Sequence, residues 1–144
     1  MNISLEVILA PILTLFVVQS IKLATDGIKG NFNLKNVLST YGGMPSTHTA
    51  VVTSLCTMVA YKEGGNSTAL AIAIIFSLIV ITDTMVLRRF IDKNSQVVKR
   101  LVDKLPESER KQFPSISTKL QHTFPQVLVG GLIGFAIAAL IQFL

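Results

Sequence analysis

The segment of residues 124–144 contains no charged side chain. An α-helix needs about 20 apolar residues to cross the roughly 30 Å hydrocarbon core of a bilayer, so this segment is long enough to span a membrane. Residues 3–24 and 67–87 form two further apolar segments of similar length. Residues 46–61 are fewer and rich in Ser and Thr, so we expect this fourth segment to cross where the bilayer is thin or where neighbouring helices shield it.

The composition excludes a disordered chain and makes an ordinary water-soluble domain a poor match. Half of the residues are hydrophobic, the mean hydropathy is +0.59 and only 15% are charged, against about 25% in soluble domains. The length of 144 residues fits one compact unit. We therefore expect an all-α fold, an integral membrane bundle of about four transmembrane helices that forms a single membrane-embedded domain over residues 1–144.

The Lys and Arg residues are distributed unevenly between the loops. Twelve of the 13 lie near or within the two longer loops, after the first and third apolar segments, and only Lys62 lies in the short loop between them. Because cytoplasmic loops carry the excess of cations, this asymmetry predicts both termini outside and both basic loops inside, most simply at the cell membrane. Since the cations flank membrane segments, we do not expect nucleic-acid binding.

The longer basic loop has its own pattern. Between residues 91 and 105, apolar residues recur at helical spacing with cations among them, until Pro106 stops the pattern. This predicts a cytoplasmic amphipathic helix. Two placements are equally compatible with the pattern: on the anionic membrane surface, or packed on the cytoplasmic face of the protein itself.

Polar residues gather at the start of the second apolar segment. Pro45 suits a first helical turn, and Ser46, Thr47 and His48 follow it. The free N–H groups of a helix N-terminus attract anions, hydroxyl groups add donors, and a histidine one turn in could shuttle a proton. Alternatively, the segment is a Ser-capped helix start with an interfacial histidine.

Further polar residues lie at the same predicted membrane depth. Arg88 and Arg89 end the third segment, His122 precedes the last one and Lys22 ends the first. Arginines suit bidentate phosphate binding but also snorkel to lipid headgroups. Asp83 lies deeper and either lines a polar site or pairs with an arginine. The convergence of two histidines, several cations and a helix N-terminus predicts a phosphate-handling site.

These residues resemble a known family. The segment Gly43-Met44-Pro45-Ser46-Thr47-His48, then Arg88-Arg89, then His122 with Gln126 and Gly130, is similar to the divergent branch of the type 2 phosphatidic acid phosphatase superfamily. That superfamily also includes the vanadium-dependent haloperoxidases. The resemblance runs from Lys22 to about Gly134.

The resemblance implies a mechanism that uses no metal or other cofactor. In it His122 attacks phosphorus, His48 protonates the leaving group, and the resulting phosphohistidine is hydrolysed. Phosphate would be held by Lys22, Ser46, Thr47, Arg88 and Arg89, with Asp83 and Gln126 in supporting positions. The implied substrate is a membrane lipid phosphate or pyrophosphate, and the implied activity is that of an acid-phosphatase-like hydrolase.

The chain departs from the superfamily pattern in three places. Lys29-Gly30 stands where an Arg-Pro pair is usual, and His122 comes 33 residues after Arg89 rather than close to it. Gln126 occupies the position of the carboxylate that usually orients the nucleophile; an amide accepts a hydrogen bond but cannot stabilise an imidazolium by charge. Gln126 therefore supports an alternative function, a non-catalytic membrane protein that keeps a pocket for phosphate or lipid headgroups.

Small residues recur every four positions on the last segment, at Gly130, Gly134 and Ala138. This spacing allows helices to approach closely. We expect packing within the bundle, with a homodimer through Gly130 and Gly134 as the alternative.

Overall fold

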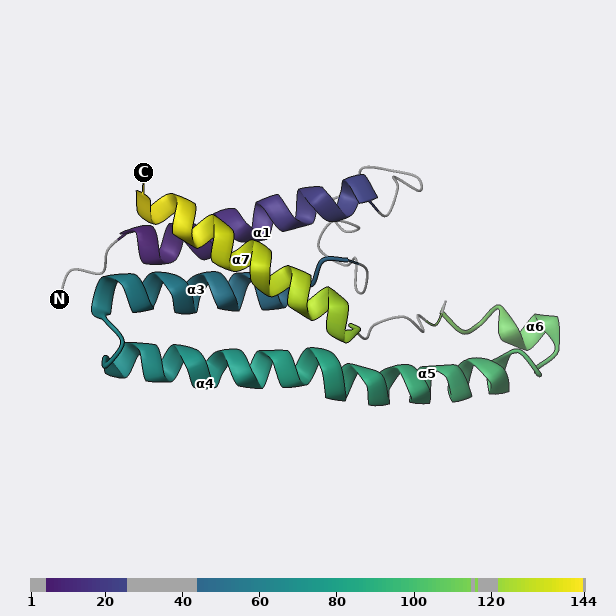
Figure 1. The fold of residues 1–144 in the computed structure, drawn as a ribbon. Helices are drawn as coiled ribbons and strands as arrows, with labels where there is room; N and C mark the ends of the chain where they lie inside the picture. Colours follow the sequence, from purple (N-terminus) through teal and green to yellow (C-terminus); the bar gives the residue numbers. More distant parts are fainter. Residues whose placement is uncertain (1–4, 26–43, 115, 117–121, 144) are drawn as a thin grey trace.

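The fold is described by a computed structural model that places residues 5–25, 44–114, 116 and 122–143. Every element in these residues is helical, which confirms the all-α expectation. Four helices, α1 (Leu5–Thr25), α3 (Thr47–Glu63), α4 (Thr68–Thr82) and α7 (Phe124–Phe143), lie roughly side by side (Figure 1). Their bounds fall within about two residues of the apolar segments for all but α4, which passes at Asp83 into a further helical segment.

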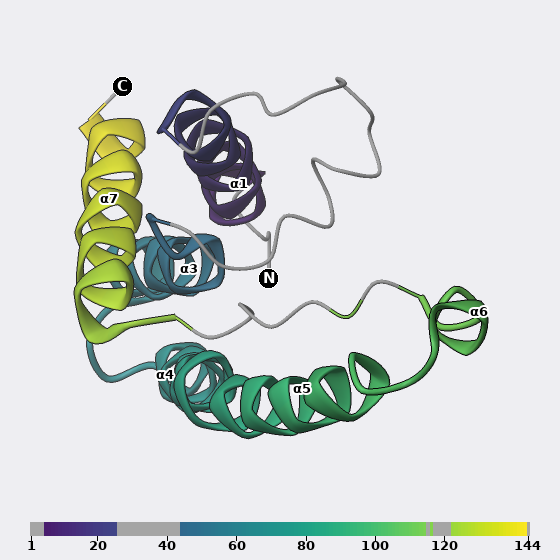
Figure 2. The ribbon, with the colours of Figure 1, turned by 90° about the vertical axis from the view of Figure 1, so that its right-hand side faces the viewer.

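Helix α3 is the centre of the bundle. It packs against α1, α4 and α7, and α1 also packs against α7 (Figure 2). The short, polar second segment is thus shielded by its neighbours, which was one of its two expected placements. Its polar groups find partners inside the bundle: Thr14 of α1 donates to Ser54 at 3.1 Å, and Cys56 lies 3.0 Å from Ser77 of α4. Such contacts join helices where no water is present.

The large apolar side chains point away from the bundle. Phe16 of α1, Ile79 of α4 and Leu132 of α7 are each more than 60% exposed, as expected for surfaces that face lipid. Within the described residues, three helices are long and apolar enough to cross a membrane, over Leu5–Lys22, Thr68–Val102 and Phe124–Phe143. The helix α3, with 17 residues, is the fourth member of the bundle.

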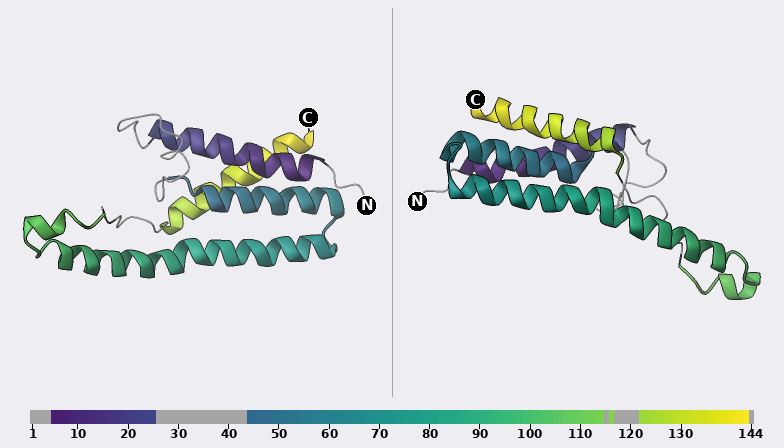
Figure 3. Two further views of the ribbon diagram at one scale, coloured as in Figure 1. Left: turned by 180° about the vertical axis from the view of Figure 1, so that it is seen from behind. Right: turned by 60° about the horizontal axis from the view of Figure 1, so that its bottom comes forward.

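The third apolar segment continues without a break into the amphipathic one. A π-helical turn, η1 (Asp83–Leu87), joins α4 to α5 (Arg88–Val102), and together they form one helix of 35 residues. The amphipathic helix is therefore present, as an extension of the third span beyond the end of the bundle (Figure 3). After Pro106 a single helical turn, α6 (Glu107–Arg110), follows.

Candidate functional site

The candidate site lies at one end of the bundle. Here α1 ends, α3 and α7 begin, and α4 passes into η1 (Figure 1). Lys22 is in the last turn of α1, Ser46 directly precedes α3, and Arg88 directly follows η1. His122 lies two residues before α7. The structure thus brings these elements to the same end, as the topology predicted.

His122 is held in a defined orientation by the start of α7. It is 5% exposed, and its Nδ1 lies 3.3 Å from Oε1 of Gln126, one turn further along. The same oxygen accepts the backbone N–H of Thr123 at 2.9 Å, which fixes the amide oxygen toward the ring. The Nδ1 atom of His122 therefore carries the proton, and Nε2 keeps its lone pair.

The surroundings of His122 favour its neutral form. Burial lowers the pKa of His122 below its usual value near 6.5, the hydrogen bond to Gln126 raises it, and the charges of Lys22, Arg88 and His48 lower it further. The net direction is downward. Only a neutral imidazole can act as a nucleophile, and the lowered pKa keeps His122 neutral to a lower pH than an ordinary histidine.

This shift can be measured by NMR titration of histidine-labelled protein. The chain has two histidines, so a His48→Gln variant assigns both signals. We expect His122 to titrate below pH 6.5, and Gln126→Glu to raise its pKa by roughly 1–3 units because a carboxylate stabilises the imidazolium. Gln142→Glu adds the same charge near the other end of α7 and should leave the pKa unchanged. A titration of His122 above pH 6.5 in the unmodified protein would contradict the assigned environment.

The start of α3 has no side-chain cap. Ser46 occupies the N-cap position but makes no side-chain capping hydrogen bond; its Oγ lies 3.0 Å from Oγ1 of Thr49 instead. Thr47 is 8% exposed, and its Oγ1 atom has no hydrogen-bond partner in the described structure. The Ser-capped helix start, the alternative weighed from the sequence, is therefore not what forms. An uncapped N-terminus with buried hydroxyl groups suits an anion.

Two glycines allow α7 to approach α3. A Cβ on Gly130 would overlap the carbonyl oxygen of Ser46, and one on Gly134 would overlap that of Ala50. At this crossing the Ser46 N–H donates to the Gln126 carbonyl oxygen at 3.0 Å. Both glycines thus pack within the bundle, one of the two roles expected for them, and Gly130 sets the spacing between Ser46 and the residues around His122.

Arg88 links η1 to α3. Its Nη2 lies 3.5 Å from Nε2 of His48, at the limit of a hydrogen bond in which the guanidinium donates. Its Nε lies 3.6 Å from Oδ2 of Asp83, whose side chain is 45% exposed. Asp83 thus pairs with an arginine, which was one of the two roles expected for it. At this exposure such an ion pair contributes little to stability.

Arg88 and Arg89 differ in exposure, and Lys22 is buried. Arg88 is half-buried beside His48, whereas Arg89 is exposed. Lys22 is 3% exposed, and its charge acts on both histidines, as does that of Arg88.

Among the described residues, no group of three or more His, Cys, Asp and Glu side chains could hold a metal ion.

Three features were missed by the sequence analysis. Asp92, one turn beyond Arg88, is 1% exposed and is the acidic residue that α5 buries. Thr84 is fully buried, and its carbonyl oxygen accepts the His122 N–H at 3.3 Å. Thr84 belongs to the π-helical turn, a type of irregularity that is frequent at functional sites. The spacing of four between Arg88 and Asp92 was a visible signal for the first; nothing in the sequence marks the π turn.

Part of the predicted motif lies outside the described residues. This applies to Lys29-Gly30 and to Gly43, which opens the Gly-Met-Pro-Ser segment. The described part of that segment begins at Met44, and the Met44–Pro45 peptide bond is cis.

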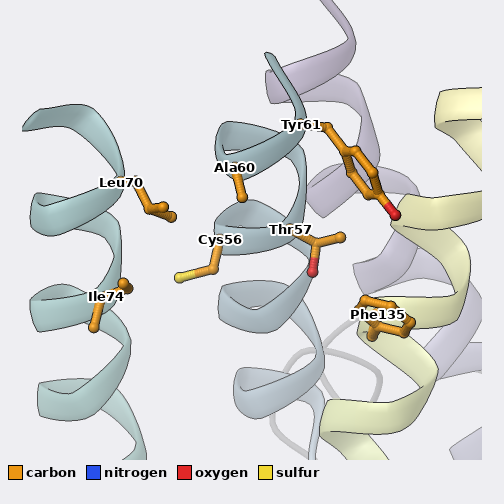
Figure 4. Close-up of a pocket in the computed structure, with 7 residues that line it drawn as sticks. All are labelled: Cys56, Thr57, Ala60, Tyr61, Leu70, Ile74 and Phe135. Atoms are coloured by element: carbon orange, nitrogen blue, oxygen red, sulfur yellow. The ribbon is translucent and has the colours of Figure 1, made fainter. Parts of the chain in front are cut away.

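A cavity of about 410 Å³ lies elsewhere, nearer the end where α3 leads into α4 (Figure 4). Its lining is almost entirely apolar and comes from α3, α4 and α7: Cys56, Thr57, Ala60, Tyr61, Leu70, Ile74 and Phe135. It contains none of the predicted site residues, so it is separate from the candidate site.

Comparisons with known proteins agree with the residue pattern. A sequence model described as "Divergent PAP2 family" matches residues 3–137. The chain is 31% identical over 119 residues to a Bacillus subtilis (strain 168) protein described as "Uncharacterized membrane protein YuiD", with 75% of each chain covered. No solved structure matches it. A match over nearly its whole length shows that this chain is a membrane protein of the divergent PAP2 family.

Proposed function

We propose that this protein is a membrane phosphatase that hydrolyses a lipid phosphate or lipid pyrophosphate at the cytoplasmic leaflet, with His122 as the nucleophile. The observation that carries the proposal is the orientation of His122: a buried imidazole whose Nδ1 is hydrogen-bonded to Gln126 and whose Nε2 keeps its lone pair. Family membership supports the same class of chemistry.

Phosphate binding is assigned to groups that converge on this end of the bundle. Lys22 and Arg88 supply positive charge, and Ser46, Thr47 and the uncapped N-terminus of α3 supply donors. Arg89 is exposed, so we assign the phosphate contact to Arg88. These donors would stabilise the negative charge on the transferring phosphoryl group, which is the main demand of phosphoryl transfer.

The proposed reaction has two steps. In the first, Nε2 of His122 attacks phosphorus, the bond from phosphorus to the leaving oxygen breaks, and His48 gives that oxygen a proton. In the second, water attacks the phosphohistidine, His48 takes the proton from the water, and the phosphorus–nitrogen bond breaks. Arg88 donates to Nε2 of His48 here, so this nitrogen carries no proton. The first step therefore requires Arg88 to turn toward the bound phosphate and Nε2 of His48 to take up a proton from solvent, which it then gives to the leaving oxygen.

The activity can be tested with purified protein in nanodiscs. We expect release of inorganic phosphate from a lipid phosphomonoester or an isoprenoid pyrophosphate with EDTA present, and inhibition by vanadate, which mimics the transition state. Release that requires an added divalent cation would contradict the proposed mechanism.

A second candidate function rests on Gln126, which cannot stabilise an imidazolium by charge. In it, the protein binds a lipid phosphate and does not turn it over. Binding with phosphate release at background would favour this function, and activity gained by Gln126→Glu would then identify the missing carboxylate as the cause.

A further inference from the structure

Helix α5 carries an apolar face that the described bundle does not cover. Phe90, Ile91, Val97, Val98 and Leu101 are between 48% and 60% exposed. Their spacing places them along one side of the helix, where the exposed Asn94 lies among them, and the opposite side carries Asp92, Gln96 and Lys99. An uncovered apolar face of this length is unusual in water and marks a surface that binds another protein or a membrane.

This face continues the lipid-facing surface of the third span. Ile79 on α4 and Val86 and Leu87 on η1 are between 45% and 63% exposed, and all belong to the same unbroken helix as α5. At about 1.5 Å per residue that helix is about 52 Å long, against roughly 30 Å of hydrocarbon. Its last part therefore reaches the headgroup layer. Figure 2, which looks along the bundle, shows α5 turning aside from the line of α4.

Cations border one edge of the apolar face. Arg89, Lys93 and Arg100 are exposed on α5 and are spaced by four and seven residues, which places them in one stripe along the helix. Lys104, four residues after Arg100, is exposed in the turn that follows α5. We call these four residues the basic stripe. Cations beside an apolar face match the phosphates and the acyl chains of an anionic leaflet together.

We propose that α5 lies in the headgroup layer of the leaflet at the site end, with its apolar face in the acyl region and the basic stripe bound to anionic phospholipid headgroups. The observations that favour lipid are the continuity with the lipid-facing surface and the position of the cations beside it. This proposal does not depend on phosphatase activity.

The depth of α5 can be measured by spin labelling of the full chain in nanodiscs. In a Cys56→Ser background, single labels are placed at Val98 on the apolar face and at Gln96 on the polar face. In discs that contain phosphatidylglycerol, we expect the Val98 label to be accessible to oxygen and protected from a water-soluble nickel chelate, and the Gln96 label to show the reverse. Equal exposure of both labels to the chelate would overturn the proposal. Dipolar coupling between Val98 labels would also overturn it, since a second copy would then cover this face.

The role of the basic stripe is tested with two triple variants that remove the same charge. The stripe variant is Lys93→Gln, Arg100→Gln, Lys104→Gln, and the control is Lys99→Gln, Arg110→Gln, Lys111→Gln. In anionic discs, the stripe variant should lose the protection of the Val98 label, down to its level in phosphatidylcholine discs, while the control keeps it. Equal loss in both variants, or in neither, would refute binding by the stripe.

Discussion

Replacing His122 with alanine is expected to abolish phosphate release, lowering turnover by about 10³-fold or more, the scale seen when a covalent nucleophile is removed. The side chain is 5% exposed and hydrogen-bonded to Gln126, so the imidazole is held in one orientation, and alanine removes the nitrogen that attacks phosphorus. The measurement is release of inorganic phosphate by purified variant and unmodified protein in matched nanodiscs, with lipid-phosphate binding followed in parallel. Full activity of the variant would contradict the assignment of the nucleophile.

A His48→Gln variant is the matched control, because it changes the other histidine of the site. A general acid contributes about 10²–10⁴-fold, and mainly when the leaving group is poor. We expect His48→Gln to lose that factor with a lipid phosphomonoester and much less with an aryl phosphate whose leaving group needs no proton. His122→Ala should be inactive with both substrates. The same loss with both substrates in the His48 variant would contradict its role as the acid.

Replacing Gly130 with alanine is expected to destabilise the crossing of α7 and α3. The new Cβ would overlap the backbone carbonyl oxygen of Ser46, and backbone cannot move aside as a flexible side chain does. Overpacking of this kind costs about 1–3 kcal/mol. Since the Ser46 N–H donates to the Gln126 carbonyl oxygen at this crossing, separating the two helices should also displace the start of α3, where we propose that phosphate binds, and lower both thermal stability and turnover.

Gly131→Ala is the control, one position further along the same helix. Its Cβ would meet Thr53 Oγ1 at 3.6 Å and Thr49 Cγ2 at 3.8 Å, which are ordinary contacts. Alanine in place of a helical glycine favours the helix by roughly 0.8–1 kcal/mol, so this variant should be at least as stable as the unmodified protein and as active. Equal stability and turnover of the Gly130 and Gly131 variants would refute the close crossing of α7 and α3.

The helices could be predicted from the sequence because apolar length alone locates a membrane span. The start of α7 at Phe124 agrees with the expected residue, and α3 begins at Thr47, one residue later than the predicted start of that segment. The continuity of α4 with α5 was not predicted, because residues 88–89 mark a change in polarity that indicates a membrane boundary and says nothing about a break in the helix.

The gathering of the site residues followed from topology, since alternate loops lie on one side of a membrane. Which side chains face one another did not follow from topology, because it depends on the rotation of each helix about its axis. A residue turns an α-helix by about 100°, so the π turn at 83–87 changes which side chains beyond it point inward. Arg88 rather than Arg89 lies beside His48, and Asp92 rather than Asp83 is the fully buried acid. The spacing of four between Arg88 and Asp92 was the one sequence signal for the second of these differences, and nothing in the sequence marks the π turn that turns both residues inward.

The central claim, that His122 is a nucleophile, is tested most directly by trapping its phosphorylated form. Protein is exposed briefly to a lipid phosphate carrying labelled phosphorus, quenched in alkali, which preserves phosphohistidine, and digested for peptide mapping. The mechanism predicts label on His122, none on His48, and none in the His122→Ala variant. Phosphate release with no trapped label on His122, or with label on another residue, would contradict it.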